Sequence, residues 1–239
     1  MQRARRPALV MIGSVLLNIL GRETVHLLGI PLYLDMLGTA VAAFTLGVWR
    51  GVAVALVTNL IGVVVSGPAS LPFALVNATG ALVWALGARR WGWGRTLPRF
   101  LGLNLVTAVA CSAVAVPILL ARYAGSIGHG QDVLTTRLMT LTDQFVFSVS
   151  AANLITSSGD KLISGFVALV IVSALPASYG GAAVWCWPSP APRPRCGEPD
   201  SARALDPGSS KSRSLDGHVW DVAGSPDGSR TRVGVRMGA

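Results

Sequence analysis

Charged residues are scarce in this sequence. Only 13% of the residues are Asp, Glu, Lys or Arg, whereas 51% are hydrophobic and the mean hydropathy is +0.55. A soluble globular domain usually has about 25% charged residues. The shortage of charge therefore argues against an ordinary soluble domain and predicts a membrane protein.

Cysteine is also rare, and the common catalytic motifs are missing. Cys111, Cys186 and Cys196 form no CxxC pair, and the three histidines are scattered, so no metal-ligand spacing is present. The phosphate-binding GxxxxGK[ST] loop, the GxSxG nucleophile turn and the HExxH zinc motif are all missing. The sequence therefore predicts no enzymatic activity, no ATP hydrolysis and no cofactor or metal.

Acidic residues are outnumbered, which gives a net charge of +9 and a pI near 10.7. Such a charge would suggest nucleic-acid binding, but the basic residues flank apolar runs and form no soluble basic face. Eight of them occupy three segments without acidic residues: Arg3, Arg5, Arg6, Arg50, Arg89, Arg90, Arg95 and Arg99. Because basic flanks stay on the cytoplasmic side, the pattern predicts a multi-pass protein of the cell membrane with both termini cytoplasmic, and no nucleic-acid partner.

Apolar runs predict six membrane-spanning helices, at about 8–22, 34–49, 51–67, 71–88, 100–122 and 159–176. No small-residue cleavage site follows the first run, so we interpret it as a retained helix rather than a signal peptide. Residues 123–158 fit either an external amphipathic helix or a half-inserted segment. We thus expect an all-α integral membrane protein with a bundle of about six transmembrane helices over residues 1–180, followed by a low-complexity, disordered tail over 181–239.

Isolated polar residues interrupt these apolar runs, and they are costly in hydrocarbon unless they face a cavity or a partner helix. Asn59 and Asn77 are expected roughly 9 to 12 Å below the outer surface, where they could share one layer. Their amides suit a neutral heteroaromatic ligand better than a bare ion. Alternatively, they bond only to neighbouring helices.

Four charged residues are further candidates for substrate binding. Asp35 and Asp160 are expected at helix starts, where a carboxylate either complements the helix dipole or contacts a ligand. Lys161 could pair with Asp35, with Asp143 or with a ligand carboxylate. The candidate substrate-binding residues are therefore Asp35, Asn59, Asn77, Asp143, Asp160 and Lys161.

Several short patterns carry a family resemblance that covers about residues 8–176. They are Leu34-Asp35 through Gly38-Thr39, Leu46-Gly47 with Trp49, Gly51 and Asn59, and Asp160-Lys161 in the last apolar segment. In these patterns the sequence resembles the substrate-binding S components of energy-coupling factor (ECF) transporters for vitamins and related micronutrients.

The resemblance implies a six-helix bundle that captures a small vitamin-like nutrient or its precursor outside the cell. It also implies docking on a transmembrane T component with two ATPase subunits, which energise uptake. In such proteins the first helix often carries small residues at four-residue spacing for contact with the T component, whereas here only Ser14 and Asn18 recur, with Gly13 alongside. The alternative is a membrane-embedded sensor module of a histidine-kinase-type signalling protein without its catalytic part.

Overall fold

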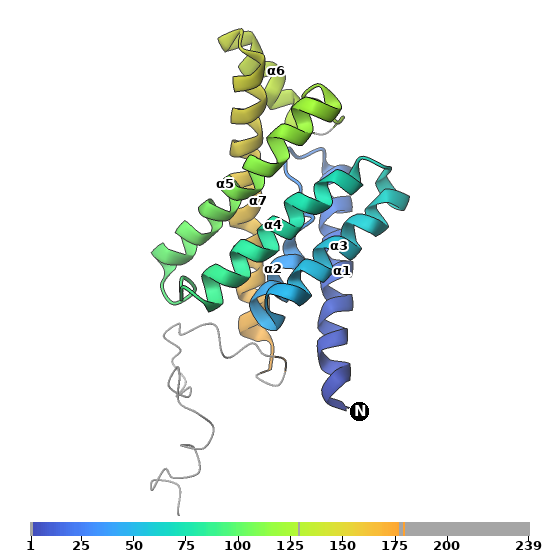
Figure 1. The fold of residues 1–239 in the computed structure, drawn as a ribbon, viewed down its shortest axis with the longest axis vertical. Coiled ribbons are helices and arrows are strands. Elements are labelled where there is room, and N and C mark those ends of the chain that lie inside the picture. Colours follow the sequence, from blue (N-terminus) through green and yellow to red (C-terminus); the bar gives the residue numbers. More distant parts are fainter. Residues whose placement is uncertain (1, 129, 177–178, 180–239) are drawn as a thin grey trace, which may run out of the picture. The chain divides into compact units, whose positions relative to one another are not determined.

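A computed structural model describes residues 2–128, 130–176 and 179. Over these residues the chain forms α-helices and no strands, which confirms the all-α prediction (Figure 1). The helices are α1 (Gln2–Leu28), α2 (Leu37–Leu46), α3 (Val48–Ser66), α4 (Ser70–Arg89), α5 (Leu97–Tyr123), α6 (Gln131–Thr142) and α7 (Phe145–Ala174). The expected tail at 181–239 lies outside the described residues.

Five of these helices, namely α1, α3, α4, α5 and α7, are long and apolar enough to cross a membrane. Their outward faces carry exposed apolar side chains such as Leu9, Leu16 and Leu20 on α1, which are 59 to 64% exposed. An exposed apolar face of this kind is favourable only against lipid or another apolar partner. The helices therefore fit a multi-pass membrane protein.

The expected second span at 34–49 is wrong in length, because α2 has only ten residues. Ten residues make a helix about 15 Å long, half of a hydrocarbon core of about 30 Å. Gly47, at a φ of 92°, ends the helix, and the segment 29–36 that precedes it is not helical. Nine of the ten α2 residues are buried, since α1, α3, α4 and α7 all pack against this short helix.

Both ends of α2 are capped by side chains from other helices. Asn18 of α1 accepts hydrogen bonds through Oδ1 from the backbone N–H groups of Gly38 (2.7 Å) and Thr39 (3.2 Å). Its Nδ2 donates to the hydroxyls of Thr39 and Thr58, each at 2.9 Å. At the other end, Arg89 of α4 donates through Nη2 to the carbonyl of Thr45 (2.8 Å). These bonds satisfy backbone groups that a buried helix end would otherwise leave without partners.

The last helix is longer than predicted. The ambiguous segment 123–158 contains α6 and nearly half of α7, and α6 packs against α7. The last long helix begins at Phe145 and not near residue 159, because Val149, Ala152 and Thr156 continue a buried helical face N-terminal to that position. Asp160 therefore lies in the middle of α7, so the expected role at a helix start is wrong.

Aromatic side chains form the core on the Gly47 side of α2. Phe44 of α2 packs edge-to-face against Trp84 of α4 and Phe100 of α5, with ring centroids 6.2 and 6.0 Å apart. Phe166 of α7 packs on Phe100 in the same geometry at 5.2 Å. The indole N–H of Trp84 donates to Asn104 Oδ1 at 2.9 Å, so the polar atom of this buried ring is satisfied. This core fixes α2 against α4, α5 and α7.

Candidate functional site

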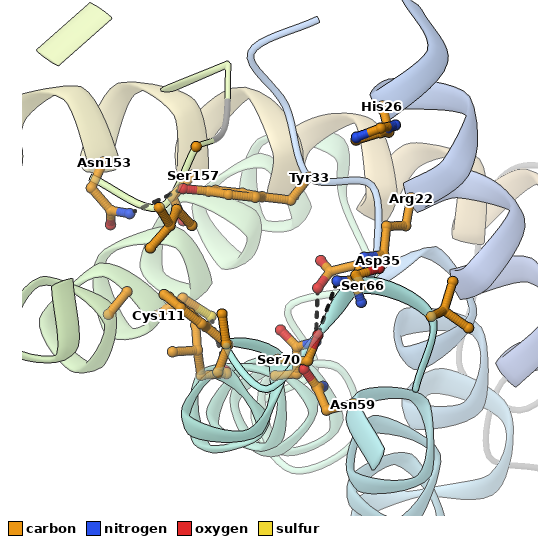
Figure 2. Close-up of a pocket in the computed structure, with 18 of the residues that line it drawn as sticks. Arg22, His26, Tyr33, Asp35, Asn59, Ser66, Ser70, Cys111, Asn153 and Ser157 are labelled. Atoms are coloured by element: carbon orange, nitrogen blue, oxygen red, sulfur yellow. Dashed lines mark hydrogen bonds between the residues drawn. The ribbon is translucent and has the colours of Figure 1, made fainter. Parts of the chain in front are cut away.

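A cavity of about 320 Å³ lies between α1, the 29–36 segment, α3, α4, α5 and α7 (Figure 2). One part of its wall is apolar and includes Phe73, Val76 and Ala115. The remainder is polar, although the helices that supply it are apolar on their outer faces. A concave space in which apolar surface and convergent polar groups meet is typical of a small-molecule binding site.

Asp35 and Asn77 form a direct contact in this cavity. Asn77 Nδ2 donates to Asp35 Oδ2 at 3.0 Å, and both residues line the wall. Asp35 was expected either to complement the dipole at the start of the second helix or to contact a ligand. The N-cap residue of α2 is Met36, and no side-chain hydrogen bond from that residue caps the helix. Because Asn18 supplies the cap instead, the Asp35 carboxylate is left to face the cavity.

Asn59 also lines the cavity, on α3. Its Nδ2 donates to the carbonyl of Ala55 one turn earlier, at 2.9 Å. A hydrogen bond to a neighbouring helix was the expected alternative to ligand binding, whereas the observed bond lies within α3. Asn59 and Asn77 thus lie on the wall of one cavity, and they make no hydrogen bond to each other among the described contacts.

Asp160 and Lys161 form a fully buried ion pair. Asp160 Oδ2 accepts from Lys161 Nζ, and Asp160 Oδ1 accepts from the backbone N–H of Leu34 at 2.7 Å. Leu34 has a φ of 45°, which is uncommon for a residue other than glycine. Asp160 thus holds the 29–36 segment against α7, and Lys161 itself reaches the cavity wall.

A polar junction joins the 29–36 segment to α6 and α7. The Tyr33 hydroxyl donates to Gln131 Oε1, which also accepts from Asn153 Nδ2 at 3.1 Å. Figure 2 shows the Tyr33 side chain extending toward Asn153 and Ser157 of α7. Desolvation raises the pKa of Tyr33 well above its usual value, and the carboxylates of Asp160 and Asp35 raise it further, so the phenol remains a donor.

Charged groups from α1 lie at the more exposed end of the cavity. Arg22 donates through Nη2 to the hydroxyl of Ser70 on α4 at 2.9 Å, and Glu23 lies beside it on the wall. His26 also lines this end and is exposed. The contact between Arg22 and Ser70 therefore joins α1 to α4 at the rim of the cavity.

Four of the six candidate residues line the cavity: Asp35, Asn59, Asn77 and Lys161. Asp160 lies immediately behind the wall as the partner of Lys161. Asp143 is exposed at the C-terminal end of α6, in the left-handed conformation, and is not among the lining residues. Asp143 therefore lies outside the site that the structure assembles.

Sequence reasoning missed several lining residues, notably Asn153, Ser157, Tyr33 and Arg22. Asn153, Ser157 and Lys161 recur at intervals of four along α7, so all three lie on one helical face. This spacing was detectable in the sequence, but the expected start of the last helix near residue 159 excluded its first two members. Tyr33 and Arg22 carry no comparable periodic signal, because their positions depend on the non-helical 29–36 segment and on the packing of α1.

The chemistry available in the described residues is that of polar binding. No group of three or more His, Cys, Asp or Glu side chains among them is placed to hold a metal ion. Cys111, a buried free thiol, contributes to the wall and bonds to the carbonyl of Val76. Carboxylate, ammonium, amide, hydroxyl and aromatic groups therefore surround the space together.

Comparison with known proteins identifies no relative. No family model matches the chain, and neither a curated protein nor a solved structure matches it significantly.

Proposed function

We propose that this chain is the substrate-binding S component of an ECF-type uptake transporter of the cell membrane. In this function it captures a small vitamin-like nutrient or precursor from outside the cell. The chain then delivers the nutrient together with a separate transmembrane T component and two ATPase subunits. Both ends of the bundle face the cytoplasm, as the distribution of arginine suggests.

The observation that carries this proposal is the polar cavity inside an apolar helical bundle. Polar and ionisable groups at membrane depth are expensive, so their convergence on one cavity favours a ligand pathway or binding site. Asp35, Asn59 and Lys161 come from three separate patterns that carry the family resemblance, and all three line this one cavity. A cavity near 320 Å³ suits a small ligand, since it lies at the lower end of the usual range for ligand pockets.

The exposed face of α1 is the surface on which we expect the proposed T component to dock. Ser14 and Asn18 are buried against the inner helices, so they are unavailable for docking. Gly13 is exposed, and its neighbours Leu9 and Leu16 present a broad apolar face. Docking through α1 would therefore use this larger apolar face instead of a stripe of small residues.

The test is to purify the full chain from cells grown in rich medium and to identify released small molecules by mass spectrometry. A nutrient-like compound at near-stoichiometric amount, together with co-purification of a T component and ATPases, is the expected result. A folded chain that carries no small molecule and recovers no ATPase would overturn the proposal. Recovery with a histidine kinase would instead support the sensor module.

A further inference from the structure

The charges around the cavity do not balance. Asp160 and Lys161 neutralise each other as an ion pair. Arg22 and Glu23 at the more exposed end carry opposite charges. Together with Asp35, these groups carry one net negative charge, and neither Lys161 nor Arg22 makes an ion pair with Asp35 among the described residues.

The immediate partner of Asp35 is neutral. Asn77 donates one hydrogen bond to Oδ2, and no other hydrogen bond to the carboxylate is found among the described residues. The Lys161 ammonium is held by Asp160 and makes no ion pair with Asp35. In a membrane interior a carboxylate without a compensating cation is costly, so a positive group that enters the cavity gains free energy there.

The neighbouring amides present oxygen atoms to the same space. Asn59 Nδ2 donates to the Ala55 carbonyl and Asn77 Nδ2 donates to the Asp35 carboxylate. Both partners are acceptors only, which identifies the donating atom of each amide as its nitrogen. The Oδ1 atoms of both amides have no hydrogen bond among the described contacts, so each can accept one from a ligand, while each Nδ2 keeps one further N–H.

We infer that the ligand carries a positively charged group rich in N–H donors, such as an amidinium, an ammonium or a protonated amino-heterocycle, which binds against Asp35, Asn59 and Asn77. This inference rests on the proposed function and narrows its substrate class. The sequence alone favoured a neutral heteroaromatic ligand, because it did not show that Asn77 lies against the Asp35 carboxylate in the cavity wall. Phe73 and Val76 supply apolar surface for the remainder of the ligand.

Three probes of nearly equal shape test the inference: benzamidine (cation), benzamide (neutral) and benzoate (anion). Their binding to the full chain in detergent micelles is measured by ligand-observed NMR titration. We expect benzamidine to bind roughly tenfold more tightly than benzamide, and benzoate to bind most weakly. This comparison uses the unmodified protein and so needs no variant to fold.

Substitutions of single carboxylates then test where the benzamidine cation binds. Asp35→Asn should abolish the preference for benzamidine, whereas Asp143→Asn, a matched change at an exposed position outside the cavity, should leave the preference intact. Equal binding of the three probes, preference for benzoate, or no measurable binding of benzamidine would overturn the inference. Loss of the preference in Glu23→Gln but not in Asp35→Asn would also overturn it, because the cation would then bind at the rim.

The failure of this inference is distinguishable from that of the proposed function. A purified chain that carries an anionic nutrient and recovers its ATPases would keep the proposed function and refute the cationic ligand. A chain that prefers benzamidine but recovers neither a nutrient nor ATPases would keep the cationic ligand and refute the proposed function.

Discussion

Asn18 and Arg89 bind opposite ends of α2, although neither residue belongs to that helix. Isolated helices of about ten residues are only marginally stable in water, and a buried helix end in a membrane protein has no water to satisfy its backbone groups. The two side chains supply those partners from α1 and α4. The start of α2 is therefore determined by α1, and Asp35, which lies just before it, is positioned by the same contact.

Replacing Asn18 should destabilise the bundle. Asn18→Ala removes an acceptor from two backbone N–H groups and a donor from two buried hydroxyls, so we expect a loss of about 2 kcal/mol in unfolding free energy. SDS titration of the full chain in mixed micelles measures this loss. Thr24→Ala, an exposed change on the same helix, is the control and should have little effect. Equal stability of the two variants would contradict the capping role.

A methyl group at Gly38 should be more damaging than one at Gly13. A Cβ on Gly38 would overlap the backbone of Ser14, whereas a Cβ on Gly13 meets no atom within 4 Å. Gly38→Ala must therefore separate α1 from α2, and we expect it to cost at least about 2 kcal/mol. Gly13→Ala should be neutral or stabilise by up to about 1 kcal/mol, because alanine is the better helix former. Thermal unfolding of both variants, followed by circular dichroism, checks the difference, and similar melting temperatures would refute the close approach.

Removing one charge of the ion pair between Asp160 and Lys161 should lower the unfolding free energy more than removing both charges. Lys161→Met leaves a buried carboxylate without its cation, for which we expect a loss of about 3 to 5 kcal/mol. The double variant Asp160→Asn with Lys161→Met should recover part of that loss, since the Asn oxygen can still accept from Leu34 N–H. Unfolding free energies of the single and double variants provide the measurement. A double variant less stable than Lys161→Met would show that the charges are not coupled.

Asn77 should affect ligand binding through Asp35. Asn77→Ala removes the hydrogen bond that orients the Asp35 carboxylate, together with one cavity-facing acceptor, so we expect affinity for the co-purified small molecule to fall roughly tenfold. Thr79→Ala, an exposed change on the same helix, is the control. Isothermal titration calorimetry with the identified compound measures both. Unchanged affinity in a folded Asn77→Ala variant would remove this residue from the site.

Four of the six candidate residues could be placed at the cavity from sequence, because an isolated polar group in an apolar run is costly wherever it faces lipid. That argument identifies Asp35, Asn59, Asn77 and Lys161, but it does not identify their partners. Asn59 bonds within its own helix and Asn77 bonds to Asp35, whereas the sequence indicated a ligand or a neighbouring helix as the partner of each amide. The partner depends on side-chain direction and helix packing, which hydropathy does not contain.

The sequence by itself determined that this chain is helical and apolar enough for a membrane, because long apolar runs bounded by arginine and glycine are a local property of the chain. Only the tertiary structure decided that the second run is a ten-residue helix, since its ends are satisfied by Asn18 and Arg89 from distant positions. Likewise, only the packing of α7 against the 29–36 segment placed Asp160 beside Leu34 and Lys161 on the cavity wall. Contacts between residues separated by 20 to 126 positions follow from how the helices pack and not from any local pattern.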